Sequence, residues 1–213
     1  MDPAPRLREL YRRLLDAFGP QGWWPGETPL EVLVGAVLTQ NTNWGNVERA
    51  IMNLKAAGVL DFLALRGLPR PELAGLIRPA GYYNLKADRL GNLLDLLYRR
   101  FGADWRAVFA LPLPEARALL LAAKGVGPET ADSILLYAGG LPSFVIDAYT
   151  FRALTRHGLG QGLDYHKLRA LFMASLPVDS ALYNEYHALL VRLGKERCKK
   201  GQPLCAGCPA AGW

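Results

Sequence analysis

Apolar residues recur at the spacing of an α-helix in segments spread along this 213-residue chain. Between residues 7 and 18 they fall at i, i+3, i+4, i+7, i+8 and i+11, and arginines largely surround this single stripe. The same spacing recurs at 30–38, 84–101, 114–123, 129–138, 164–174 and 180–193. Proline and glycine separate these segments at short intervals, and only residues 143–147 look extended. The sequence therefore predicts an all-α protein built from many short helices.

The net charge of the chain does not identify its binding partner. Lys and Arg total 25 against 19 Asp and Glu, and the net charge of +6 permits an anionic partner such as nucleic acid without requiring one. Arginines interrupt the first apolar stripe, so it does not resemble a signal peptide, and no stretch is long enough to span a membrane. We therefore expect a cytoplasmic protein, where a cysteine cluster indicates metal more often than disulfides.

A glycine-containing turn joins two of the predicted helices. It consists of Lys124, Gly125, Val126, Gly127 and Pro128, and is followed by Glu129 and Thr130. The glycines permit a tight turn and a close approach to another molecule, and the exposed amides of the next helix could bind a phosphate oxygen. An ordinary link between two helices has the same features, so the turn alone leaves both interpretations open.

Four motifs follow one another along the chain, and a cysteine cluster comes after them. The motifs are TPLEVLVGAVLTQNT at 28–42, GYYNLKA at 81–87, KGVGPETAD at 124–132 and VIDAYTFR at 145–152. Together they resemble the helix-hairpin-helix DNA glycosylase superfamily, which includes endonuclease III. The resemblance implies a two-lobed helical fold that acts on double-stranded DNA as a monomer. The domains would be residues 29–139, with the hairpin, and residues 1–28 plus 140–213. It also implies that the hairpin grips a phosphate and that a damaged base is flipped out of the stack, where its glycosidic bond is accessible.

The same resemblance assigns catalysis to Asp147, since a carboxylate can stabilise charge on the sugar and orient or deprotonate water. Asp147 is also placed to cap the next helix, and both roles can hold together. Family members that cut the DNA backbone carry a lysine in the second hairpin helix, which forms a Schiff base. Glu129 stands at the matching position, and Lys124 lies ahead of the turn. We therefore expect a monofunctional glycosylase that leaves an abasic site.

Tryptophans flank the helix predicted at 30–38: Trp23 and Trp24 precede it, and Trp44 follows it. This arrangement resembles the 3-methyladenine glycosylases of the superfamily, in which such aromatics form the base pocket. An alkylated purine is cationic and would gain on the order of one to a few kcal/mol by stacking on indole rings. Core packing is the alternative for each tryptophan. Gln40 and Asn41 are candidates for filling the gap left by the flipped base, or for hydrogen bonding within the helix turn.

The cysteines close the chain. Six residues separate Cys198 from Cys205, two separate Cys205 from Cys208, and basic residues surround Cys198. The spacing resembles the superfamily's [4Fe–4S] loop, which would also present basic residues to DNA. The family's fourth cysteine would fall one position beyond Trp213, and zinc with a histidine or free thiols are alternatives.

The leading hypothesis is excision of alkylated purines. The alternatives are an endonuclease III-type glycosylase and lyase acting on oxidised pyrimidines, a DNA-binding homologue without catalysis, and a helical scaffold. The histidines His157, His166 and His187 show no spacing typical of a catalytic triad, so we expect surface or packing roles for them.

Overall fold

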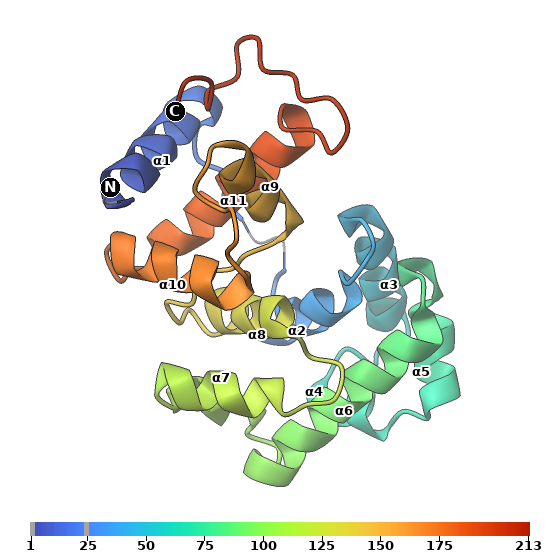
Figure 1. Ribbon diagram of the computed structural model, residues 1–213. Coiled ribbons are helices and arrows are strands. Elements are labelled where there is room, and N and C mark those ends of the chain that lie inside the picture. The colour runs from blue at the N-terminus through green and yellow to red at the C-terminus, as the bar shows by residue number, and fades with distance from the viewer. Residues whose placement is uncertain (1–2, 24–25) are drawn as a thin grey trace. The chain divides into compact units, whose positions relative to one another are not determined.

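The structure, a computed structural model, describes residues 3–23 and 26–213 (Figure 1). Helices hold 65% of the chain and the described residues contain no strand, which confirms the predicted all-α class. None of the helices in these two ranges is both long and apolar enough to cross a bilayer. Trp24, predicted to line the base pocket, lies outside the described residues.

Internal contacts divide the chain into two compact units. A terminal unit comprises Met1–Trp24 and Pro142–Trp213, and a central unit comprises Pro25–Leu141. The predicted domain boundaries, 29–139 and 1–28 with 140–213, stay predictions, because a unit defined by its contacts is not thereby shown to fold alone.

The central unit is built around one helix that is buried on all sides. This helix, α2 (Pro29–Leu38), is buried from Leu30 to Leu38, and it packs against helices on several sides. Its start is fixed by the Thr28 hydroxyl, which accepts the amide of Glu31 at 3.2 Å and contributes about 1 kcal/mol to helix stability. The other helices of the unit are α3 (Trp44–Ala56), α4 (Phe62–Gly67), α5 (Arg70–Leu76), η1 (Arg78–Ala80), α6 (Tyr83–Phe101), η2 (Trp105–Ala110), α7 (Leu113–Leu121), α8 (Pro128–Ser133) and η3 (Ile134–Ala138).

The terminal unit has an aromatic core. Its helices are α1 (Ala4–Phe18), α9 (Ala148–Arg156), α10 (Tyr165–Ser175) and α11 (Ser180–Glu196). Phe144 stacks on Phe172 with ring centroids 4.0 Å apart, and the Tyr186 hydroxyl donates to the carbonyl of Leu7 at 2.8 Å. Residues 143–146, which the sequence left as an extended segment, form a buried connector with no regular structure before α9. This connector delivers the acidic residue at its end to the start of α9.

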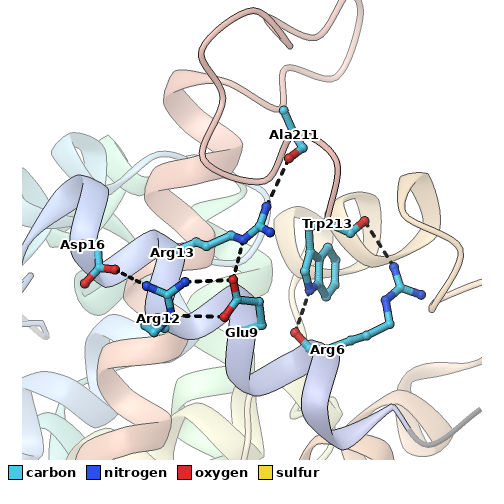
Figure 2. A network of polar contacts seen from close by, with 7 residues as sticks. All are labelled: Arg6, Glu9, Arg12, Arg13, Asp16, Ala211 and Trp213. Carbon is cyan, nitrogen blue, oxygen red and sulfur yellow. Dashed lines mark hydrogen bonds and ion pairs between the residues drawn. The ribbon is translucent and has the colours of Figure 1, made fainter.

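The last residues of the chain pack on α1 (Figure 2). Trp213 Nε1 donates to the carbonyl of Arg6 at 2.6 Å, and Arg6 donates back to the carbonyl of Trp213 at 3.3 Å. Arg13 reaches the carbonyl of Ala211 at 3.2 Å while it also pairs with Glu9 at 2.8 Å. Side chains of α1 therefore hold the end of the C-terminal loop through hydrogen bonds on both sides of it.

Candidate functional site

The glycine turn of the central unit is a tight hairpin between α7 and α8. Gly125 has a φ of +100°, and a Cβ at this position would lie 2.2 Å from Cγ of Arg89, so only glycine fits. Val126 is buried beneath the turn, whereas Lys124 and Glu129 are exposed. Gly127 precedes α8 in an extended conformation, and a Cβ there would meet no atom within 4 Å. The hairpin thus buries one apolar side chain and leaves the backbone around Gly127 open.

A buried ion pair joins the two helices of the hairpin. The guanidinium of Arg117 on α7 contacts both carboxylate oxygens of Asp132 on α8, at 2.9 and 3.0 Å. The Asp132 side chain is fully buried, so this two-pronged contact keeps a charge satisfied in the interior. The pairing fixes the angle at which α8 leaves the turn.

The residues after α2 contact the hairpin directly. Gln40 Nε2 donates to the hydroxyl of Thr130 at 2.9 Å and to the carbonyl of Gly125 at 3.2 Å. Arg89 donates to the amide oxygen of Gln40. Gln40 therefore bonds to the hairpin rather than within its own helix turn. Asn41 is exposed and has a left-handed backbone, with φ of 54°.

The buried side chain of Lys86 fixes the loop after α2, a role that the sequence pattern did not predict. Lys86 Nζ, with its residue only 1% exposed, donates to the carbonyls of Leu38 at 2.8 Å and Ala80 at 2.7 Å. These carbonyls end α2 and η1, where free acceptors favour a cation. Burial, and secondarily the charge of Arg89, lower the pKa of Lys86 to about 8. Lys86 shares a helix face with Leu90, and this lysine on an apolar stripe was the available signal.

Tyr82 is a second candidate functional residue that the sequence pattern did not predict. Tyr82, which precedes α6, has a left-handed φ of 47° and a side chain that is 71% exposed. Left-handed backbone is uncommon outside glycine, and it concentrates at functional and strained positions. Because Lys86 bonds both the end of α2 and the end of η1, the loops carrying Asn41 and Tyr82 are fixed by one ammonium group.

In the terminal unit, Asp147 is the N-cap of α9. Its Oδ1 accepts the amide of Thr150 at 2.7 Å, and its Oδ2 lies 3.6 Å from Nε2 of His187. Burial alone would raise the pKa of Asp147, but His187 and the Thr150 amide outweigh it and hold this pKa below its ordinary value. The carboxylate is therefore ionised at neutral pH although its side chain is only 11% exposed. His187 is buried on α11 beside this acid, a neighbour that its sequence spacing did not indicate.

The predicted pocket tryptophans belong to different units. Trp23, in the terminal unit, is half-buried and has Lys195 Nζ 5.5 Å from the centre of its ring. Trp44 begins α3 in the central unit and packs against that unit's apolar core.

The three predicted metal ligands are not brought together. Cys198 is buried and its sulfur accepts a hydrogen bond from Arg156 at 3.2 Å, Cys205 is exposed, and Cys208 is half-buried. Within the two described ranges, no three His, Cys, Asp or Glu side chains converge as metal ligands. Three thiols that do not converge do not fit a [4Fe–4S] cluster, which takes four thiolate ligands.

The described residues of this all-α chain contain a glycine hairpin between two helices and a buried, ionised carboxylate that caps a later helix. Residues 34–177 match the family model described as HhH-GPD superfamily base excision DNA repair protein. The chain belongs to this superfamily and is a DNA glycosylase of the HhH-GPD and endonuclease III family.

Individual relatives cover nearly the whole chain. A protein of Methanocaldococcus jannaschii, provisionally named a DNA repair glycosylase, is 47% identical over 205 residues, which are 95% of this chain and 93% of the relative. The H. pylori 3-methyladenine DNA glycosylase MagIII bound to 1,N6-ethenoadenine has a TM-score of 0.79 at 29% identity, covering 92% and 98% of the two chains. A non-covalent endonuclease III–DNA complex, at 22% identity, has a TM-score of 0.82 over 99% and 94%, and indicates the shared fold.

Proposed function

We propose that this chain hydrolyses the N-glycosidic bond of an alkylated purine, such as N3-methyladenine, in double-stranded DNA and leaves an abasic site. The observation that carries the proposal is the ionised, nearly buried carboxylate of Asp147 at the start of α9. The likeness to a 3-methyladenine DNA glycosylase over 92% of the chain supports this lesion class.

Hydrolysis of this glycosidic bond can proceed with one carboxylate as the catalytic group. As the base leaves with the electron pair of the C1′–N bond, positive charge develops on the sugar, and a nearby carboxylate stabilises that charge. The oxygen of a water molecule then adds to C1′, and its proton passes to the carboxylate. An N3-alkylated purine is cationic and leaves as a neutral base, so it needs no separate acid on the enzyme. Asp147 would perform both remaining tasks.

We assign recognition of the cationic base to Trp23. Because Lys195 Nζ already lies 5.5 Å from the centre of its ring, the base would displace this ammonium group or stack on the opposite face of the indole. The assignment of Trp24 and Trp44 to the base pocket rests on the resemblance alone.

We place the DNA contacts of the central unit on the hairpin and on the neighbouring loops. The open backbone around Gly127 suits a phosphate oxygen at the start of α8. Gln40 would have to exchange its hydrogen bonds with Thr130 and Gly125 to enter a gap in the duplex, whereas Asn41 is already exposed. The exposed ring of Tyr82 offers a surface on which a base can stack.

Glu129 underlies the expectation that the backbone is not cut. It is exposed in the first turn of α8, and a carboxylate cannot form the imine that a lyase requires. Borohydride treatment during turnover should therefore trap no covalent enzyme–DNA adduct. A trapped adduct would show that another amine, with Lys124 the first candidate, acts as a lyase nucleophile.

The test is a panel of duplexes carrying N3-methyladenine, an oxidised pyrimidine or an abasic site, incubated with the wild type and with Asp147→Asn. We expect excision only from the alkylated duplex, a loss of roughly 100-fold or more in Asp147→Asn, and unchanged DNA affinity. Asparagine keeps the N-cap, so a loss would reflect the missing charge rather than a damaged helix. Excision of the oxidised pyrimidine alone would favour the endonuclease III alternative, and equal binding with no excision anywhere would favour a DNA-binding homologue.

A further inference from the structure

Two elements hold the carboxylate of Asp147. The backbone amide of Thr150 on α9 donates to Oδ1 at 2.7 Å, and Nε2 of His187 on α11 lies 3.6 Å from Oδ2. The His187 and Asp147 side chains are 6% and 11% exposed. A histidine at this distance in a poorly hydrated site interacts far more strongly with a carboxylate than it would in water.

The spacing between Asp147 and His187 is set by tight packing of α9 on α11. A Cβ at Gly194 would lie 2.3 Å from the ring of Tyr149, so the two helices approach as closely as a glycine allows. Arg152 strengthens the contact by donating to the carbonyls of Gly194 at 3.2 Å and of Cys198 at 2.6 Å. Since both helices are fixed in this way, His187 is held in register with the start of α9.

A buried carboxylate without compensation takes up a proton, because desolvation disfavours its charged form. A protonated Asp147 could neither stabilise a positive sugar nor accept the proton of water. The groups that oppose protonation are His187 from α11, and the amide and side chain of Thr150 from α9. His187 makes the largest of these contributions, and it alone comes from a helix other than the one that Asp147 caps.

We propose that His187 is a positioning residue for Asp147, which fixes the orientation of its Oδ2 and keeps the carboxylate ionised in the pH range where the enzyme works. The inference rests on the proposed catalytic role of Asp147. His187 touches no substrate in this scheme and acts only through the carboxylate.

The test compares His187→Phe, which fills the space without a polar edge, with His187→Gln, which keeps a hydrogen-bond donor. His166→Gln is the matched control, because His166 is an exposed histidine of the same unit. Single-turnover excision from N3-methyladenine duplex is measured from about pH 3 to 8, a range that includes the lowered pKa of Asp147, together with DNA affinity. In parallel, the Asp147 carboxyl is titrated by carbon-13 NMR without DNA, and Asp147→Asn assigns the signal.

We expect His187→Phe to move the acidic limb of the rate profile upward by about one pH unit. It should also lower the neutral rate roughly tenfold, because Oδ2 loses the contact that orients it, with unchanged DNA affinity. His187→Gln should recover part of both effects, and His166→Gln should match the wild type. The Asp147 carboxyl signal should titrate at higher pH in His187→Phe.

An Asp147 titration that does not move in His187→Phe would overturn the inference even if the rate fell, since that fall would reflect packing alone. A fully active His187→Phe with an unshifted pH profile would overturn it as well. The proposed function and the contact can fail separately. If the wild type excises no base but the Asp147 carboxyl still titrates at higher pH in His187→Phe, the proposed function is overturned and the contact between His187 and Asp147 is supported.

Discussion

Lys86 shows how one buried side chain can serve two helix ends. Its ammonium group satisfies the terminal carbonyls of α2 and η1, and it does so at the cost of removing a charge from water. That cost is visible in the pKa of about 8, well below the ordinary 10.5 of a lysine. The two exposed residues that follow these helix ends, Asn41 and Tyr82, both have left-handed backbone. Lys86 therefore stabilises loop conformations that would be unfavourable by themselves.

Replacing this lysine should destabilise the protein in a pH-dependent way. Lys86→Met leaves two carbonyls without their donor, and we expect a loss of about 2 kcal/mol in the free energy of unfolding at pH 7. Between about pH 8 and 10.5 the unfolded lysine binds a proton that the folded one has lost, so wild-type stability should rise with pH relative to the variant. Urea unfolding of both proteins at pH 7, 8, 9 and 10 measures the difference. A difference that stays constant with pH would show that Lys86 is not buried as a charged group.

At the scale of elements, the hairpin uses its two glycines for different reasons. Gly125 needs a positive φ and lacks room for a Cβ, whereas Gly127 has an ordinary extended backbone and open space around it. The first glycine is thus required by the fold. The second is required only if another molecule approaches the backbone closely.

This difference predicts that two alanine variants lose different properties, one its stability and the other its affinity for DNA. Gly125→Ala should lower the free energy of unfolding by about 2 kcal/mol or more, because of left-handed strain and the clash with Arg89. Gly127→Ala should stay within about 0.5 kcal/mol of the wild type but weaken DNA binding, since its methyl group would stand between the backbone and a phosphate. Thermal unfolding and fluorescence anisotropy with a labelled duplex separate the two. Unchanged DNA affinity in Gly127→Ala would remove the hairpin backbone from the proposed DNA contacts.

The hairpin also marks the limit of periodicity as a guide to elements. The spacing of apolar residues predicted one helix at 129–138, but α8 ends at Ser133 and a π-helical turn, η3, follows. The amide of Gly139 bonds the carbonyl of Ile134 five residues earlier. One extra residue per turn changes the hydrogen-bond partner without removing apolar residues from the core, so the sequence pattern scarcely records it.

At the scale of the whole molecule, charge matters through its placement. The net charge of +6 is modest, and several arginines are engaged with the chain's own carbonyls, as Arg152 and Arg156 are. Lys199 and Lys200 are exposed on the C-terminal loop. Because these two lysines are exposed, we expect this loop to contribute to DNA binding.

Removing these two charges should reduce the salt dependence of DNA binding. For the double variant Lys199→Ala and Lys200→Ala, we expect weaker affinity and a slope of log K against log salt that is shallower by about one to two. The variant Arg99→Ala with Arg100→Ala removes the same charge from the exposed end of α6 and serves as the control. Equal slopes in the two variants would mean that the loop acts only through net charge.

The amino-acid sequence was sufficient to predict the all-α class, several of the longer helices and the resemblance to the family. Apolar spacing, the Thr28 cap and the glycines of the hairpin are local features, and local hydrogen bonding and backbone sterics decide them. It also placed Asp147 at a helix start, where the structure has it.

Which distant side chains meet depends on the packing of the helices. The contacts of His187 with Asp147, of Lys86 with the carbonyl of Leu38, and of Gln40 with Thr130 join residues 40, 48 and 90 positions apart in the chain. Among the described residues, Cys198, Cys205 and Cys208 do not come together as metal ligands, although their spacing resembles that of an iron–sulfur loop. Such contacts depend on how helices pack against one another, and burial patterns along a single chain report that a face is covered without reporting by what.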